Sequence, residues 1–127
     1  LQQKIAFTKD TPLKIFNANS ATLLESLKLG AAGFCGVMLN FHPELYGWLC
    51  RNWRKNMQKA QKLQDFATVA SLIELQNYPT NAKYHMSLSG VPIGLVTRSK
   101  DYAGFQELQK SEVQALYQCW QNYSAIL

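Results

Sequence analysis

The stretch Gly33-Phe-Cys-Gly-Val-Met-Leu-Asn40 is almost entirely apolar and ends in a single amide side chain. An apolar run of this length is typical of a strand that is buried on both faces, as the strands of parallel sheets are. Gly36 within the run indicates the close approach of another group. The run therefore predicts a strand over Gly33–Leu39 in an α/β fold.

A second β-prone run, Leu13–Asn17, lies upstream. Between the two runs, leucines recur at helical spacing through Ala21–Leu29, and Gly30 stands where a left-handed residue commonly ends a helix. Pro43 then occupies a position suited to the first turn of another helix. The order strand, helix, strand, helix predicts a parallel βαβα unit. Two parallel strands alone leave both sheet edges unpaired, so we expect further strands upstream.

The second half of the chain is expected to be helical. Apolar residues recur every three or four positions through Met57–Gln76, and Asn77–Pro79 predicts a turn. The next helical segment is closed by Gly90, and Val91–Ser99 is expected to form a loop. The last helix is predicted to begin at Ser111, because a glutamine three residues later completes a capping box.

The composition of the 127-residue chain is that of a folded domain, with 47% apolar residues and a net charge of +5. The longest apolar run, Gly30–Leu39, is too short to span a bilayer, and Leu1–Asp10 has no signal-peptide pattern. Because the chain begins with leucine, a fragment, a processed product and a trimmed polypeptide all remain open. The three cysteines are odd in number and lack a CxxC pair, which favours the cytoplasm over a disulfide framework.

Several motifs occur in a specific order along the chain. They are Lys14-Ile-Phe-Asn-Ala-Asn-Ser20, Leu29-Gly30, Gly33-Phe-Cys-Gly36, Asn40-Phe-His-Pro43, Ala60-Gln-Lys-Leu-Gln64, Pro79, Lys83, Leu88 with Gly90, and Arg98. This ordered set resembles that of one enzyme family, the dihydrodipicolinate synthase and N-acetylneuraminate lyase family. The resemblance runs from about Leu13 to the C-terminus.

The resemblance implies the C-terminal portion of a (β/α)8 barrel. Residues 1–54 would supply its last two βα units, strands 7 and 8, and residues 55–127 a C-terminal helical region. The family's members are class I aldolases that join a lysine of strand 6 to pyruvate or another 2-oxo acid as a Schiff base. That lysine, and a proton-relaying tyrosine of strand 5, are expected before Leu1. The chain alone is therefore expected to be inactive. The resemblance also implies that the enzyme needs no cofactor and that it is a homo-oligomer, a dimer or tetramer.

No lysine of this chain has the setting that such chemistry needs. Lys14, Lys28 and Lys83 lie at a strand start or on helices, not at an apolar strand end where desolvation would lower the amine pKa. We interpret all three as solvated surface residues, and we predict no catalytic residue here.

The resemblance implies four substrate-binding residues, placed after the two strands as in other barrels. Ala18 stands where the family has glycine with its backbone carbonyl toward the substrate. Asn19 and Ser20 stand where sialic-acid lyases carry larger polar groups, although helix capping would explain both equally well. Cys35 replaces an aliphatic residue that packs on pyruvate; a buried packing thiol is its alternative. Val37 replaces a serine of the sialic-acid lyases, and this departure together with Ser20 argues against sialic acid as the substrate.

A different class of function is indicated by basic residues that recur at helical spacing, Arg51, Lys55, Lys59 and Lys62. On one continuous helix, with Trp48 and Trp53 nearby, they would suit a small nucleic-acid- or protein-binding module. The family pattern instead breaks the helix near Asn56. We favour a solvated face, with neither nucleic acid nor membrane as a partner.

The two histidines are far apart in the sequence, and no carboxylates cluster with them. His42 precedes Pro43 and His85 lies in a helical stretch, so both are expected to be caps or surface residues. A metal site is not expected.

Overall fold

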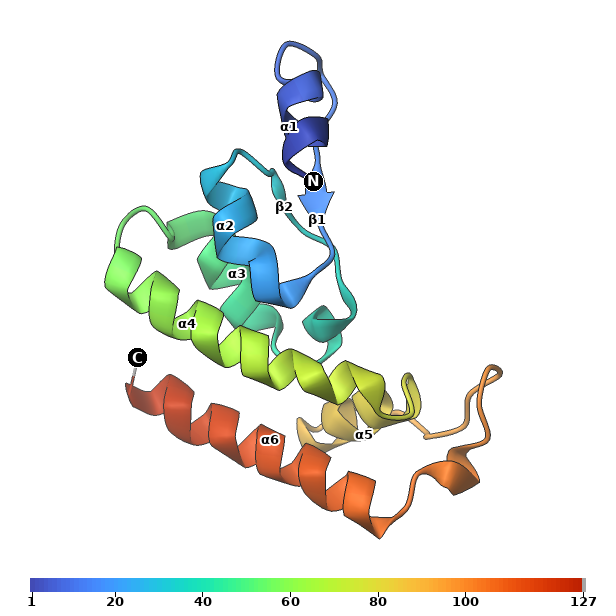
Figure 1. The fold of residues 1–127 in the computed structure, drawn as a ribbon. Coiled ribbons are helices and arrows are strands. Elements are labelled where there is room, and N and C mark those ends of the chain that lie inside the picture. Colours follow the sequence, from blue (N-terminus) through green and yellow to red (C-terminus); the bar gives the residue numbers. More distant parts are fainter. Residues whose placement is uncertain (127) are drawn as a thin grey trace. The chain divides into compact units, whose positions relative to one another are not determined.

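The computed structural model describes residues 1–126, which form mostly helices and one two-stranded sheet (Figure 1). The described elements are α1 (Gln2–Thr8), β1 (Phe16–Asn17), η1 (Ser20–Thr22), α2 (Leu23–Lys28), β2 (Gly33–Phe34), η2 (Val37–Asn40), α3 (Pro43–Asn52), α4 (Met57–Ala70), η3 (Ser71–Leu75), α5 (Thr80–Leu88), η4 (Tyr102–Gly104) and α6 (Glu107–Ile126), where η marks a 3-10 helix. They divide into two compact units: Leu1–Leu39 with Pro43–Ser71, and Asn40–His42 with the residues from Leu72 onward.

In the first unit the two strands pair in parallel, with Phe16 opposite Gly33 and Asn17 opposite Phe34. Because α2 lies between them in the sequence, the predicted β-α-β order is confirmed (Figure 1). Gly30 has a φ of 103°, the left-handed conformation that ends a helix without steric cost to glycine. The chain can therefore turn from α2 directly into β2.

The predicted extent of both strands was wrong. Only the last two residues of Leu13–Asn17, and only the first two of Gly33–Leu39, lie in strands. Val37–Asn40 forms a 3-10 turn, within which Met38 is fully buried. An unbroken apolar run does not distinguish a buried strand from a buried helical turn, because both bury side chains on all sides.

The core of the first unit lies where α4 packs against η1, α2 and α3. The rings of Phe34 and Tyr46 stack with centroids 4.3 Å apart and planes 9° from parallel, so β2 is anchored to α3. The fully or almost fully buried apolar side chains here are Leu23, Leu24, Leu27, Met38, Leu45, Tyr46, Leu49, Ala60, Leu63 and Ala67.

The basic residues at positions 51, 55, 59 and 62 do not lie on one continuous helix. α3 ends at Asn52, and α4 begins only after Asn56, whose Oδ1 accepts a hydrogen bond from the amide of Lys59 (2.9 Å). Asn56 is therefore a helix N-cap, and it separates Arg51 from the lysines of α4. The ammonium group of Lys59 lies 5.1 Å from the ring centre of Trp48, within cation–π range. The expected helix break is confirmed.

In the second unit α5 packs against α6, and two histidines lie in its core. The interpretation of His42 and His85 as surface or capping residues was wrong, because their exposed fractions are 0% and 2%. Their ring centroids are 5.2 Å apart, and Tyr117 and Trp120 of α6 pack against them. Burial lowers the pKa of His42 to about 3, with a further contribution from His85, and burial lowers the pKa of His85 to about 4.

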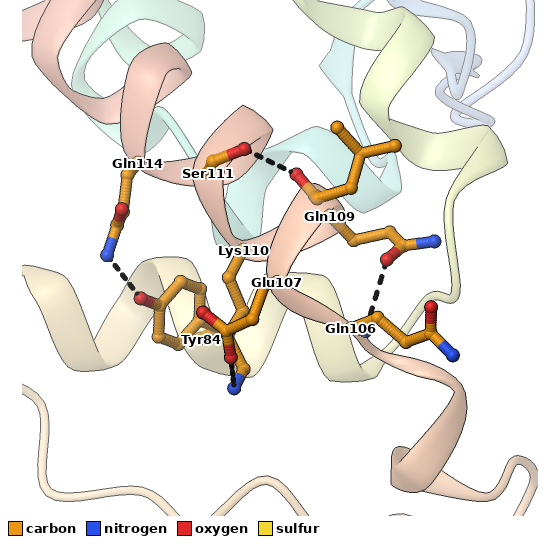
Figure 2. Close-up of polar contacts among 8 residues, drawn as sticks. Tyr84, Gln106, Glu107, Gln109, Lys110, Ser111 and Gln114 are labelled. Carbon is orange, nitrogen blue, oxygen red and sulfur yellow. Dashed lines mark hydrogen bonds and ion pairs between the residues drawn. The ribbon is translucent and has the colours of Figure 1, made fainter.

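The last helix begins four residues before the predicted cap. Figure 2 shows its first turn, where the side chain of Gln109 accepts a hydrogen bond from the amide of Gln106 (3.1 Å). Ser111 lies inside the helix and donates to the carbonyl of Leu108 (2.7 Å), so the predicted cap was wrong. A serine hydroxyl can satisfy either a cap or a carbonyl of the preceding turn, and the sequence pattern alone does not separate the two. Val113 is fully buried as expected.

Candidate functional site

The segment that follows β1 is shaped by the buried side chain of Asn17. Its Oδ1 accepts a hydrogen bond from the amide of Asn19 (2.9 Å), which folds the chain into an Asx turn. Its Nδ2 donates to the hydroxyls of Ser26 (3.0 Å) and Thr22 (3.1 Å). The polar residue at the end of the strand therefore fixes the backbone of the residues that come after it.

Ser20 is held from two other helices. Gln64 of α4 donates from Nε2 to the Ser20 carbonyl (2.8 Å) and accepts at Oε1 from the amide of Leu24 (2.7 Å). The hydroxyl of Tyr46, from α3, donates to the hydroxyl of Ser20 (3.0 Å). Ser20 is 2% exposed and Gln64 is 6% exposed, so these bonds lie in the core. Buried bonds of this kind fix a loop firmly, because breaking one leaves a polar group without water.

The segments after the two strands meet at Ala18 and Gly36. A side-chain carbon placed on Gly36 would lie 2.5 Å from the Ala18 carbonyl oxygen and 2.4 Å from Cζ of Phe34. The expectation that another group approaches Gly36 closely is therefore confirmed. The groups that approach are a backbone carbonyl and an aromatic ring, and only glycine leaves room for both.

Cys35 lies at the same edge, immediately after β2, and its amide donates to the carbonyl of Asn17 (2.8 Å). Its side chain is exposed, so it is not a buried packing thiol. Cys50 behaves differently: it is partly buried behind the strand, and burial raises the pKa of its thiol. Ala18 and Asn19 are exposed as well, whereas Ser20 is buried beneath them.

The four predicted site residues therefore lie together at the carboxyl ends of two adjacent strands. What they offer a ligand is a set of backbone amides and carbonyls, the amide side chain of Asn19 and the thiol of Cys35. Lys14 and Lys28 are exposed, and Lys28 pairs with Glu25 at 3.6 Å. Within residues 1–126 no three His, Cys, Asp or Glu side chains gather as a metal site would require. No helix of the described part is long and apolar enough to cross a membrane.

In α/β proteins, parallel strands joined by a helix commonly carry ligand-binding groups after their carboxyl ends. A model of the Dihydrodipicolinate synthetase family matches residues 2–119. The chain belongs to this family, which confirms the resemblance read from its motifs. It is a family of class I aldolase-like lyases that use pyruvate-like substrates and are often oligomeric. Neither a curated protein nor a solved structure matched the chain.

Sequence reasoning named the exposed residues of this edge but missed the groups that support them. Gln64 was noted only as part of a motif, and Tyr46 was not singled out. A signal for Gln64 was present, because it is a polar residue between Leu63 and Ala67 on the apolar face of α4. A polar side chain in that position needs a buried partner, and here the partners belong to the segment after β1.

Proposed function

We propose that this chain forms the last two βα units and the C-terminal helices of a (β/α)8 barrel in a lyase or aldolase that binds a 2-oxo acid as a Schiff base, similar to dihydrodipicolinate synthase. Family membership supports the reaction class. The observation that carries the placement is the contact of the Ala18 carbonyl with Gly36, at the carboxyl ends of two adjacent parallel strands. Barrel enzymes build their active sites at that end of the strands.

The proposed role of this edge is to form one wall of the 2-oxo acid pocket. The backbone at Ala18 lines the pocket, and Asn19 offers a side-chain amide to the substrate's polar groups. Cys35 packs its soft, weakly polar side chain against the methyl carbon of a pyruvate-like substrate. Ser20 contributes from beneath, since its bonds to Tyr46 and Gln64 keep the wall in place.

The covalent step belongs to a lysine on a preceding strand. Its neutral amine adds to the keto carbon, water leaves, and the resulting iminium withdraws electrons from the neighbouring carbon–carbon bond. A lysine needs desolvation to be neutral near pH 7. The lysines of the β-α-β segment, Lys14 and Lys28, are exposed, and each precedes a strand rather than directly following one, which supports a catalytic lysine elsewhere in the parent enzyme.

Unpaired sheet edges support additional strands and assembly with other copies. Each strand has one hydrogen-bonded neighbour among residues 1–126, and exposed strand edges favour pairing. We propose that upstream strands close the barrel and that the enzyme is a dimer or tetramer. The cysteines at 35, 50 and 119 are free thiols, which suits a cytoplasmic location.

Mass spectrometry after treatment with pyruvate and borohydride tests the proposal. The parent enzyme should gain one reduced pyruvate adduct on a single lysine outside residues 1–127, and the isolated chain should gain none. In the parent, Cys35→Val should keep the adduct, because packing is preserved, whereas Cys35→Phe should fill the pocket and abolish it. No adduct on the parent would refute the lyase assignment. An adduct on the isolated chain would refute the assignment of the lysine to a preceding strand.

A further inference from the structure

A hollow of about 470 Å³ lies in the second compact unit. It lies between the start of α5 and the loop that contains residues 96–99. Its lining residues are Pro79, Lys83, Val96, Thr97, Arg98 and Ser99. Its volume lies within the range of roughly 300–1,000 Å³ that small-molecule sites occupy.

Three of these residues are motif positions to which no function was assigned. Pro79, Lys83 and Arg98 match the family pattern across a span of the sequence that includes a helix and a long loop. The structure brings all three to the lining of one hollow. Because these three residues line one hollow, we expect them to share a role, and the two basic side chains among them indicate an anion as the ligand.

The lining is positively charged. Two of its six lining residues are basic, Lys83 and Arg98, and none of the six is acidic. The acidic side chain closest in sequence, Asp101, is directed to the amide of Ala103 (2.9 Å). Two cations in a hollow without a lining carboxylate attract an anion, and two positive charges suit a doubly charged one.

The loop side of the hollow is ordered by its own hydrogen bonds. Lys83 donates to the carbonyl of Val96, which fastens the loop to α5. The hydroxyl of Thr97 donates to the carbonyl of Lys100 (2.7 Å) and accepts from the amide of Lys100 (3.1 Å). The turn that carries Arg98 and Ser99 is therefore closed by two bonds, so its donors need little reordering to meet a ligand.

We infer that this hollow binds the phosphate group of a small phosphorylated compound or free phosphate. Arg98 would form paired hydrogen bonds to two phosphate oxygens, and Lys83 would act as a point charge. The hydroxyl of Ser99 adds a neutral donor, and Pro79 and Val96 border the remaining space with apolar surface. The lining residues belong to the second compact unit and the proposed 2-oxo acid wall to the first, so the two share no residue.

The test is an NMR titration of this chain at fixed ionic strength and pH. Inorganic phosphate, glycerol 3-phosphate, glycerol and acetate are the four probes. Both phosphate probes should give saturable shifts at the amides of residues 83 and 96–99, whereas glycerol should give none. A lower dissociation constant for glycerol 3-phosphate than for inorganic phosphate would identify a phosphorylated compound as the ligand. Equal dissociation constants would identify free phosphate. Acetate should bind at least tenfold more weakly than phosphate.

Charge-removing variants separate a site from general attraction to a basic protein. Arg98→Gln and Lys83→Met should each weaken phosphate binding about tenfold or more, since each removes a charge-assisted hydrogen bond. Lys100→Gln removes an equal charge from the same turn but does not line the hollow, so it should leave binding within twofold. Arg98→Gln does not touch the bond from Lys83 to Val96, so its result holds even where Lys83→Met loosens the loop. Absence of saturation, equal binding of acetate, or equal losses in Arg98→Gln and Lys100→Gln would overturn the inference.

Discussion

Gln64 donates a 2.8 Å hydrogen bond to the carbonyl of Ser20, a residue 44 positions away in the sequence. Its other amide atom accepts from Leu24, so one buried side chain satisfies both a carbonyl and an amide of the segment after β1. Neither backbone group can reach water when that side chain is lost. This side chain thus connects α4 to the wall that we assign to the substrate.

Replacing Gln64 by leucine should lower the free energy of unfolding by about 2 to 4 kcal/mol, because two buried backbone groups would lose their partners. Urea denaturation of this chain measures the change. Gln61→Leu is the matched control: Gln61 is exposed on the same helix and its side chain donates to the exposed Asp65, so the change in its free energy of unfolding should stay within about 0.5 kcal/mol. A similar decrease in the free energy of unfolding in both variants would show that the buried hydrogen bonds of Gln64 do not stabilise the fold.

Replacing Gly36 by alanine should destabilise the first unit by about 1 to 3 kcal/mol, since the added methyl group would overlap the Ala18 carbonyl and the Phe34 ring. Gly94 is the control glycine, because an added carbon there meets nothing within 4 Å. Thermal denaturation should show a lower midpoint for Gly36→Ala and an unchanged or slightly higher one for Gly94→Ala. An unchanged midpoint for Gly36→Ala would contradict the close contact.

The stability of the second unit should depend on pH through His42 and His85. Their folded-state pKa values, about 3 and about 4, lie below the ordinary value of 6.5, so the unfolded chain takes up protons first as the pH falls. The stabilisation is complete above about pH 6.5 and is lost as the pH falls toward 4 and 3. Each histidine contributes at most about 1.4 kcal/mol per pH unit in that window.

Imidazole NMR shifts provide the direct measurement. Both rings should remain neutral at pH 5, while the histidine of a short unstructured peptide is mostly protonated. Urea denaturation at pH 7 and pH 5 should show a loss of about 2 to 4 kcal/mol. Ordinary titration of either ring near pH 6.5 would mean that it is solvated and would remove the basis for this pH dependence.

Asn56→Ala should cost about 1 kcal/mol, because Asn56 caps α4 through its bond to the Lys59 amide. Ser111→Ala should change the stability by less than about 0.5 kcal/mol, because Ser111 is exposed within α6 and its hydroxyl donates to a carbonyl of its own helix. Chemical denaturation of the two variants side by side checks the assignment. The reverse order would place the start of α6 at Ser111 after all.

The parts of the fold that were predictable are those with a local cause. Gly30 and Pro43 mark helix boundaries through their own backbone preferences, and the parallel pairing follows from the strand–helix–strand order. The strand ends were not predictable, because pairing depends on neighbours that local sequence does not specify. His42 and His85 were misassigned for the same reason: each is polar by itself, and only their mutual packing with Tyr117 and Trp120 makes burial tolerable.

The candidate site was predictable in its exposed residues and not in its supports. Ala18, Asn19 and Cys35 follow residues predicted to be in strands, and barrel active sites lie at the carboxyl ends of strands, so these residues could be named from the sequence. Ser20 also follows that rule, yet its hydroxyl is used internally by Tyr46. Supporting residues that are distant in the sequence are hard to predict. For Gln64, the available signal was a polar residue on the apolar face of a helix.

The bond between Gln64 and Ser20 has a consequence for the proposed substrate wall. The wall at Ala18 takes its shape from a helix that contributes no residue to the wall itself. A small rotation of α4, caused by a larger or smaller side chain at Leu63 or Ala67, would displace Gln64 and with it the segment after β1. If the proposed 2-oxo acid pocket is the site, libraries for new specificity should therefore diversify the buried face of α4, where compensating pairs of substitutions would reshape the proposed wall while each of its exposed residues stays unchanged.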